Sequence, residues 1–229
     1  MLTIGLVGGM SWESSAVYYR LLNQGVEERL GGLSSARVVL SSVDFGELTD
    51  LQRGEQWDEV GSVLAKAAAG VEAAGADVLL MCTTSFHLVA DQVEAAIDIP
   101  MLHLADVVAE AVKGQNLSTV AFLGTAFSMG RPFFTDRLAF HDLKVMTPED
   151  EHHETVNGII YDELVHGNTS DRSRRKVVNL INQLWEDGAE GAILGCTELE
   201  TLVKQADVDV PLFPVTTLHV QAALDRALA

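Results

Sequence analysis

The feature that most constrains this chain is an internal repeat: three landmarks of its first half recur, in the same order, about half the chain later. Each landmark is a short apolar run that leads into glycine, hydroxyl or proline-containing sequence. The pairs are Ile4–Gly9 with Val120–Thr125, Asp77–Thr83 with Gly191–Thr197, and Asp98–Leu102 with Asp209–Phe213. One match would mean little, because strand–glycine turns are common. Three in one order favour two copies of one plan over a single continuous sheet.

Short apolar runs alternate with longer amphipathic stretches along the whole sequence. The short runs are typical of buried strands in a parallel sheet, and the longer stretches of crossover helices. The expected strands are Thr3–Val7, Arg37–Val43, Asp77–Met81, Thr119–Leu123, Leu143–Met146 and Gly191–Leu194. The expected helices are Ser14–Leu30, Glu55–Ala74, Phe86–Ile97, Met129–His141, Glu151–His166, Arg172–Asp187 and Thr217–Leu228. We predict an α/β fold of two pseudo-symmetric three-layer lobes, each with a parallel four-stranded-type sheet.

The boundary between the lobes is expected within Ala109–Ser118, where Lys113–Asn116 supplies helix-ending and turn residues. Residues 1–110 then form the first lobe and residues 111–214 the second. The last segment, residues 215–229, is expected to return to the first lobe.

Composition narrows the class of partner. The 229 residues carry a formal net charge of −18. Nucleic acids and anionic membranes bind clustered Lys and Arg, so we expect neither as a partner. The N-terminus has no basic flank or long apolar stretch, and two cysteines make no disulfide framework. We therefore expect a cytoplasmic protein with reduced thiols that binds a small molecule.

The repeat places the two cysteines in equivalent positions. Ligands of open parallel sheets bind outside the carboxyl ends of the strands, and each repeated landmark ends there. The segments expected at this edge are Gly8–Ser11, Cys82–Ser85, Gly124–Thr125 and Cys196–Glu198. If the lobes face one another, Cys82 and Cys196 lie on opposite walls of an interlobe cleft. Racemisation at a Cα needs one group to remove a proton from one face and another to deliver one to the opposite face, which two thiols can do in both directions.

A second interpretation of the cysteines is packing. Free cysteine is among the most buried residue types and often behaves as a small hydrophobe. On that interpretation the chain is a two-lobe small-molecule sensor whose thiols have no chemical role. The shared slot, with threonine after each cysteine, favours the catalytic interpretation, and a disulfide between them is not expected in a reducing compartment.

The residues around these landmarks resemble the aspartate/glutamate racemase family, and the aspartate-racemase branch in particular. The N-terminal match is Gly5–Ser14, read as Gly-Leu-Val-Gly-Gly-Met-Ser-Trp-Glu-Ser, followed by Tyr18, Tyr19 and Asn23. Further matches are Ser42–Phe45, Gln52, Arg53, Trp57, Cys82–His87, Leu102–Asp106, Leu123–Thr125 and Gly195–Glu198. The resemblance covers essentially the whole chain. It implies a two-lobe enzyme that needs neither pyridoxal phosphate nor another cofactor or metal, racemises aspartate or glutamate, and forms a homodimer.

The resemblance also implies individual roles. Cys82 and Cys196 match the catalytic pair. The residues that fall where family members line the amino-acid site are Met10, Gln52, Thr83, Ser85, Thr125 and Thr197. Ser11, Thr84 and Glu198 join this substrate-binding set because they share its strand ends, and Arg53 is the nearest cation for a second carboxylate. Thr84 stands where the family usually has Asn, so an amide with two donors is lost and the substrate stays open.

Several alternatives remain at this stage. Isomerisation of a dicarboxylate, as in maleate isomerases, and racemisation of a non-acidic amino acid are both compatible with two cysteines. The opening glycines lack the G-x-G-x-x-G spacing, so no dinucleotide is expected. His152 and His153 are interpreted as an exposed helix start rather than a metal site. His87 either pairs with a thiolate or packs, and Glu198 either orients a substrate amine, tunes Cys196, or complements a helix N-terminus.

Overall fold

The computed structural model describes residues 1–229, which divide into two compact units. Unit 1 contains Met1–Leu104 and His219–Ala229, and unit 2 contains Ala105–Leu218. The first division therefore falls a few residues before the expected one, at the start of helix α5 (Leu104–Gly114). The second falls inside helix α11 (Val215–Leu228), so the last segment of the chain belongs to unit 1.

Unit 1 is built on a parallel sheet of three strands in the order β2-β1-β3. The strands are β1 (Ile4–Gly8), β2 (Val38–Ser42) and β3 (Val78–Met81). The fourth strand expected around Pro100 is reduced to one parallel bridge between Leu79 and Met101. Helix α5 begins shortly after this bridge, at Leu104. Here the sheet has three strands rather than the four expected.

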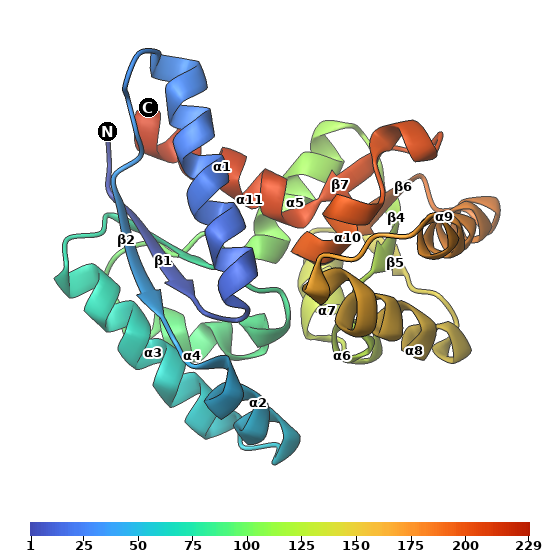
Figure 1. Ribbon diagram of the computed structural model, residues 1–229, viewed down its shortest axis with the longest axis horizontal. Helices are drawn as coiled ribbons and strands as arrows, with labels where there is room; N and C mark the ends of the chain where they lie inside the picture. The colour runs from blue at the N-terminus through green and yellow to red at the C-terminus, as the bar shows by residue number, and fades with distance from the viewer. The chain divides into compact units, whose positions relative to one another are not determined.

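The strands of unit 1 send alternate side chains into two separate cores. One core contains Ile4, Leu6, Val78 and Leu80 and packs against helices α1 (Trp12–Leu30) and α11. The other contains Val7, Leu79 and Met81 with side chains from three helices. These are α2 (Phe45–Arg53), α3 (Trp57–Ala73) and α4 (Ala90–Glu94). Figure 1 shows α1 and α3 on the two sides of this sheet. The period of two along each strand thus makes unit 1 a three-layer structure.

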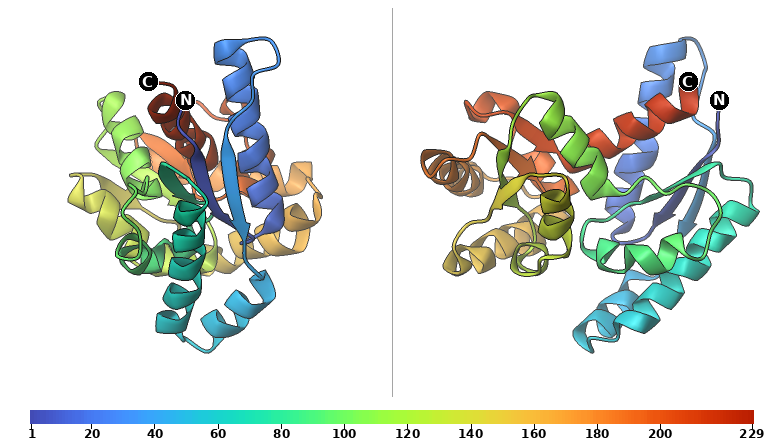
Figure 2. Two further views of the ribbon diagram at one scale, coloured as in Figure 1. Left: turned by 90° about the vertical axis from the view of Figure 1, so that its left-hand side faces the viewer. Right: turned by 180° about the vertical axis from the view of Figure 1, so that it is seen from behind.

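Unit 2 repeats this plan with four parallel strands in the order β5-β4-β6-β7. The strands are β4 (Thr119–Leu123), β5 (Lys144–Met146), β6 (Gly191–Leu194) and β7 (Leu212–Pro214). The helices are α6 (Ala126–Gly130), α7 (Phe133–Phe140), α8 (Asp150–Gly158), α9 (Asp171–Glu186) and α10 (Thr197–Leu202). The views of Figure 2 show unit 2 with its helices around the strands.

Two helices expected from the sequence are interrupted in unit 2. Pro132 separates α6 from α7, because proline lacks the N–H that a continuous helix needs. Helix α8 passes into a π-helical segment, Ile159–Glu163, and then a 3-10 turn, Leu164–His166. Gly167 ends this turn with a φ of 74°.

The sequence repeat is a repeat of topology. β1 in unit 1 and β4 in unit 2 each pair with two parallel strands, and one partner of each, β3 or β6, directly precedes a cysteine. The amino ends also match: the Asp77 carboxylate accepts a hydrogen bond from the Thr3 N–H at 2.6 Å. The Glu190 carboxylate likewise accepts from the N–H groups of Ser118 at 2.7 Å and Thr119 at 2.9 Å, and these bonds lower the pKa of Glu190. The prediction of an α/β fold with two parallel sheets is confirmed.

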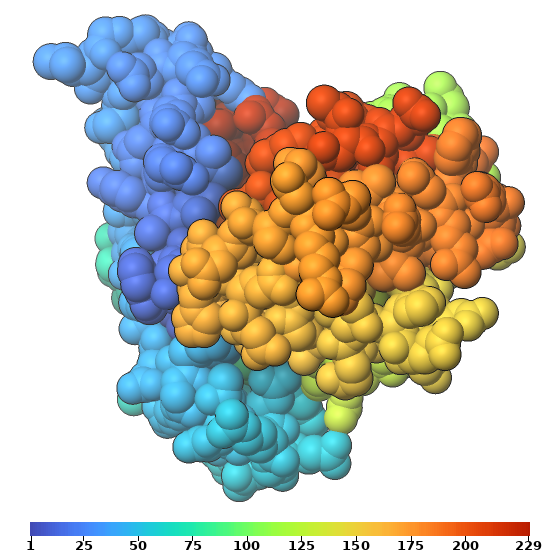
Figure 3. Space-filling view, turned by 45° about the vertical axis from the view of Figure 1, so that its right-hand side comes forward, coloured from blue at the N-terminus to red at the C-terminus, as the bar shows by residue number.

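One segment of each unit is prominent at its surface. The loop after α1 projects from unit 1, where Leu33 is fully exposed, and the segment from residue 159 to 170 reaches the surface of unit 2 (Figure 3). None of the helices combines the length and the apolar character needed to cross a bilayer.

Candidate active site

Cys82 lies directly after strand β3, inside the core of unit 1. Its N–H continues the sheet by donating to the Val7 carbonyl at 2.9 Å, and only 1% of the residue is exposed. It packs in the same core as Tyr18, Leu80 and Leu102. Burial raises the pKa of the Cys82 thiol above its ordinary value. In the unliganded protein this cysteine is therefore a thiol and not a thiolate.

The hydroxyl residues after Cys82 form a tight turn. The Thr83 N–H donates to the Met81 carbonyl at 2.9 Å, and a 3-10 turn begins at Ser85. Thr83 and Ser85 are half-buried, whereas Thr84 is buried at 8% exposure. The side chain in the slot where the resemblance expects Asn thus lies inside the protein.

The turn after β1 brings Met10 and Ser11 to the same edge of the sheet. Gly9 has a φ of 95°, and a Cβ there would lie 2.2 Å from the Val43 carbonyl oxygen, so only glycine fits. Ser11 caps α1 by accepting from the Ser14 N–H at 3.2 Å. Met10 packs in one core with Leu48 of α2 and Phe86 of the 3-10 turn. Met10, at the carboxyl end of β1, therefore packs with side chains from the segments that follow β2 and β3.

Gln52 and Arg53 are the last residues of α2. The Arg53 side chain is 79% exposed and pairs with Asp50 at 3.3 Å. The cation expected for a second substrate carboxylate is thus held in a local, solvent-exposed ion pair of the helix surface.

Cys196 follows Gly195 at the end of β6 and is half-buried. Burial is the largest effect that raises the pKa of its thiol, and the negative charge of Glu198 raises it further. The N–H of Leu199 acts in the opposite direction. No cationic side chain is among the groups that act on this thiol. Cys196, like Cys82, is therefore protonated in the unliganded protein.

Threonines connect neighbouring strand ends around Cys196. The hydroxyls of Thr197 and Thr216 are hydrogen-bonded at 3.1 Å, which links the residues after β6 to those after β7. Glu200 accepts from the Thr216 N–H at 2.6 Å, and burial raises its pKa to about 7. At the end of β4, Thr125 accepts from the Ser128 N–H at 3.2 Å and so caps α6. The predicted site residues Thr125, Cys196 and Thr197 thus follow strands β4 and β6 at the carboxyl edge of the unit 2 sheet.

Tyr161 also belongs to this edge and was missed by the sequence analysis. It lies on the π-helical segment. Burial raises the pKa of its hydroxyl most, and the nearby groups Cys196 and Glu198 raise it further. Nothing in the local sequence separates it from the rest of the helix expected over Glu151–His166. Only the packing of the folded chain places it beside Cys196.

Gly195 is required by the close approach of two strands just before Cys196. A Cβ there would lie 2.5 Å from Cε2 of Phe122 and 2.7 Å from the Leu123 carbonyl oxygen. We expect Gly195→Ala to lower the free energy of unfolding by about 1–3 kcal/mol, because neither backbone nor a buried ring can move freely. Urea unfolding measures this. Gly70→Ala is the matched control, since a Cβ at this exposed helical position meets nothing within 4 Å; a similar loss in both variants would contradict the explanation.

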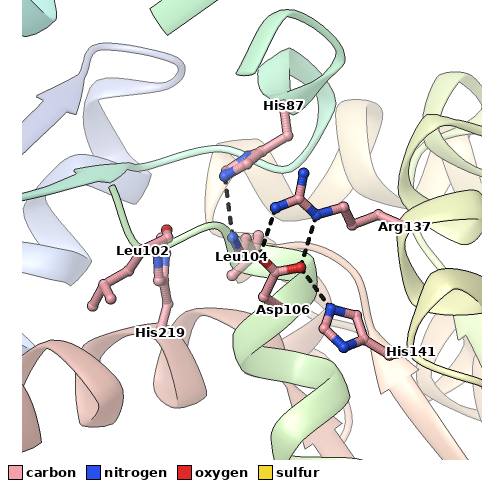
Figure 4. Close-up of polar contacts among 7 residues, drawn as sticks. All are labelled: His87, Leu102, Leu104, Asp106, Arg137, His141 and His219. Atoms are coloured by element: carbon pink, nitrogen blue, oxygen red, sulfur yellow. Dashed lines mark hydrogen bonds and ion pairs between the residues drawn. The ribbon is translucent and has the colours of Figure 1, made fainter. Parts of the chain in front are cut away.

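Three histidines form a buried cluster in unit 1. The Leu104 N–H donates to Nε2 of His87 at 3.3 Å (Figure 4), and the His87 ring lies 4.7 Å from that of His103. His219 of α11 donates from Nε2 to the Leu102 carbonyl at 2.7 Å. Of the two interpretations of His87, these contacts support packing.

Asp106 ties α5 to α7 within unit 2. Its carboxylate accepts from Nε and one Nη of Arg137 at 2.8 and 2.7 Å, and lies 2.8 Å from Nε2 of His141 (Figure 4). His153, by contrast, is buried and hydrogen-bonded to the Pro148 carbonyl at 2.9 Å. The side chains of His152 and His153 are not part of a group that could hold a metal ion.

Each of the two α/β units contains a parallel sheet and one strand–Cys–Thr element. The chain therefore belongs to a class of duplicated, open-sheet proteins. Within that class it belongs to the Asp/Glu/hydantoin racemase family, whose pattern matches residues 7–223. The resemblance inferred from the sequence is confirmed, and family membership supports a racemase-type enzyme.

Solved structures agree with this assignment. The chain is 44% identical to a candidate Asp/Glu racemase from Yersinia pestis, with a TM-score of 0.95 over 100% of both chains. It is 33% identical to an aspartate racemase homologue from Pyrococcus horikoshii OT3, with a TM-score of 0.91 over 100% of both chains. Unliganded arylmalonate decarboxylase shares the fold at 15% identity, with a TM-score of 0.58 over 99% of this chain and 93% of that chain.

Proposed function

We propose that this protein is a cofactor-independent amino-acid racemase that transfers protons at the Cα of aspartate or glutamate between Cys82 and Cys196. The observation that carries the proposal is the equivalence of the two cysteines. Each directly precedes a threonine at the carboxyl end of an equivalent strand: β3, which pairs with β1 in unit 1, and β6, which pairs with β4 in unit 2. Chance core packing does not require two thiols in one slot of a duplicated plan.

The proposed reaction needs one thiolate and one thiol on opposite faces of the same substrate. The thiolate forms an S–H bond as the Cα–H bond breaks, and the electron pair passes into the Cα–carboxylate system. The second thiol then gives its proton to the opposite face of Cα. The roles are exchanged for the other enantiomer.

Substrate binding has to create the thiolate, because neither thiol has a cationic neighbour. The α-ammonium group of an amino acid is a cation of the required kind. We propose that it binds beside Glu198, where it would offset the negative charge that opposes ionisation of Cys196. The hydroxyls of Thr83, Ser85, Thr125 and Thr197 are the proposed donors to the substrate carboxylate.

Racemisation of a non-acidic amino acid is a second candidate, and a specific observation favours it. Glu198 and Glu200 lie near Cys196, and Arg53 is engaged with Asp50. A side-chain carboxylate would meet acidic groups at the first place and a solvent-exposed, already paired cation at the second. A substrate with a neutral side chain avoids both.

Chiral chromatography of single L-amino acids incubated with the purified protein tests the function. Racemase activity predicts D-enantiomer from at least one amino acid, with solvent deuterium at Cα when the reaction runs in D₂O. Activity on aspartate and glutamate supports the first candidate, and activity on neutral amino acids alone supports the second. Conversion of maleate to fumarate would instead favour the dicarboxylate isomerase, and binding without any turnover would favour the sensor.

The pH dependence of the reaction follows from the raised pKa of both thiols. Between about pH 6.5 and 8.5 we expect kcat/KM to rise about tenfold per pH unit, because the thiolate fraction grows in that proportion below the pKa. Initial rates in constant-ionic-strength buffers measure this. A profile that is flat over this range would show that a group already ionised at neutral pH is the base.

A further inference from the structure

Tyr161 is an exposed residue of the π-helical segment, and the two residues before it are buried. Ile159 and Ile160 of the π-helical segment are buried at 4% and 2% exposure, whereas Tyr161 is 45% exposed. The segment around it forms part of the surface of unit 2 (Figure 3). π-Helical turns are rare and are found frequently at functional sites. The local backbone thus presents the aromatic hydroxyl of Tyr161 outward, directly after two buried isoleucines.

The position of this segment is fixed by contacts on both sides. Glu163, two residues later, accepts hydrogen bonds from the hydroxyls of Ser173 at 2.6 Å and Ser170 at 3.2 Å. The 3-10 turn Leu164–His166 then packs against α10, the helix that begins immediately after Cys196. Packing within unit 2 therefore holds the segment that carries Tyr161 against the helix that follows Cys196, and Cys196 is close enough to act on the Tyr161 hydroxyl.

The surroundings of Tyr161 keep its hydroxyl protonated, so that it can donate a hydrogen bond. Its hydroxyl makes no hydrogen bond with another group of the protein, although Cys196 and Glu198 are near. Partial burial and these acidic neighbours raise its pKa, so it remains a neutral O–H at physiological pH. A neutral O–H group can donate a hydrogen bond to a substrate carboxylate. At Cys196 no cationic side chain is present to take that role.

We propose that Tyr161 donates a hydrogen bond to the α-carboxylate of the amino-acid substrate on the Cys196 side. This inference rests on the proposed racemase function. As the Cα–H bond breaks, the electron pair moves into the α-carboxylate, and a donor aimed at its oxygen stabilises the transition state more than the bound substrate. Tyr161 keeps its own proton throughout, and the protons that move are those of Cα and the two thiols. Glu198 would bind the α-ammonium group and Tyr161 the α-carboxylate, which orients the substrate at Cys196.

The test compares Tyr161→Phe with Tyr19→Phe. Removing one donor to a developing oxyanion lowers kcat by about 10²-fold, so we expect a loss of that size in Tyr161→Phe with KM changed by no more than a few-fold. Tyr19 is 53% exposed on α1, and its substitution is expected to leave both constants unchanged. Wild-type kcat in Tyr161→Phe would overturn the inference while leaving the racemase function intact. Absence of racemisation in the wild-type protein would overturn the proposed function itself.

A second measurement separates contact with substrate from an effect through Cys196. In a Cys82→Ser background, the rate of iodoacetamide alkylation against pH reports the ionisation of Cys196 alone. We expect Tyr161→Phe to leave this profile unchanged, because a neutral phenol adds no charge. A displaced profile would show that Tyr161 acts on the thiol and would overturn the proposed contact with the substrate.

Discussion

Cys82→Ser and Cys196→Ser are each expected to lower the rate of racemisation by about 10³-fold, because each removes one partner of a two-base proton transfer. A serine hydroxyl is too weak an acid to form the required anion near neutral pH. Both variants should keep the fold, since Cys196 is only half-buried and serine has nearly the volume of cysteine. Cys82 is 1% exposed, so Cys82→Ala serves as a second variant that buries no hydroxyl. Circular dichroism and urea unfolding check the fold of each.

The two variants should differ in which enantiomer they still exchange. With one thiol left, deprotonation can occur from one face only, and the same thiol returns a solvent-derived proton to that face. In D₂O each variant is therefore expected to incorporate deuterium slowly into one enantiomer, and the two variants into opposite ones. Wild-type rates of racemisation in both variants would show that Cys82 and Cys196 are not the acid and base of the reaction. Loss of activity in one variant only would indicate a mechanism with one essential cysteine.

The repeated strand–Cys–Thr elements could be predicted from the sequence because they depend on local chemistry. A strand buried on both faces has to be continuously apolar, and the chain has to turn with small or hydroxyl residues where it leaves the sheet. Ile4–Gly8 and Gly191–Leu194 therefore stand within one residue of the predicted strands. The short helices α2 and α10 were missed, because nine and six residues give too little periodicity to recognise.

The remaining parts of the site depend on packing that sequence order does not encode. Tyr161 became part of the neighbourhood of Cys196 only through a π-helical turn inside a longer helix. Arg53 matched the family pattern, yet its side chain pairs with Asp50 on the surface of α2. Burial is the largest effect on both thiol pKa values, and it raises both. A side chain's desolvation depends on neighbours from several distant segments, so spacing alone could not predict its sign.

At acidic pH we expect His219 to contribute less to the stability of unit 1. The residue is fully buried, and because its Nε2–H donates to the Leu102 carbonyl, the neutral ring has Nδ1 free to accept from the Tyr18 hydroxyl at 3.0 Å. The pKa of His219 falls from 6.5 to about 4; burial is the largest cause, the Leu102 carbonyl opposes it, and His103 adds to it. Below about pH 6.5 His219 is therefore protonated in the unfolded chain, whereas in the folded chain it stays neutral down to about pH 4. This group alone should cost about 3 kcal/mol of stability over that range.

The wild-type protein will not show this loss directly, because Glu200 acts in the opposite direction. Its pKa rises from 4.5 in the unfolded chain to about 7 in the folded one, so its contribution to stability grows as the pH falls from about 7 to 4.5. The two effects nearly cancel in one molecule. The difference between wild type and His219→Gln isolates the histidine, because Glu200 is common to both and lies in the other unit.

At pH 7.5 we expect His219→Gln to be less stable than wild type by about 1–3 kcal/mol, since buried hydrogen bonds to Tyr18 and Leu102 are disturbed. The difference should shrink as the pH falls below about 6.5 and vanish or reverse near pH 4, because only the wild type loses stability through this residue. Urea unfolding at several pH values measures it. His166→Gln, at an exposed position, should run parallel to wild type. A pH-independent difference for His219→Gln would mean that the ring is protonated equally in the folded and unfolded chains, which its complete burial beside His103 opposes.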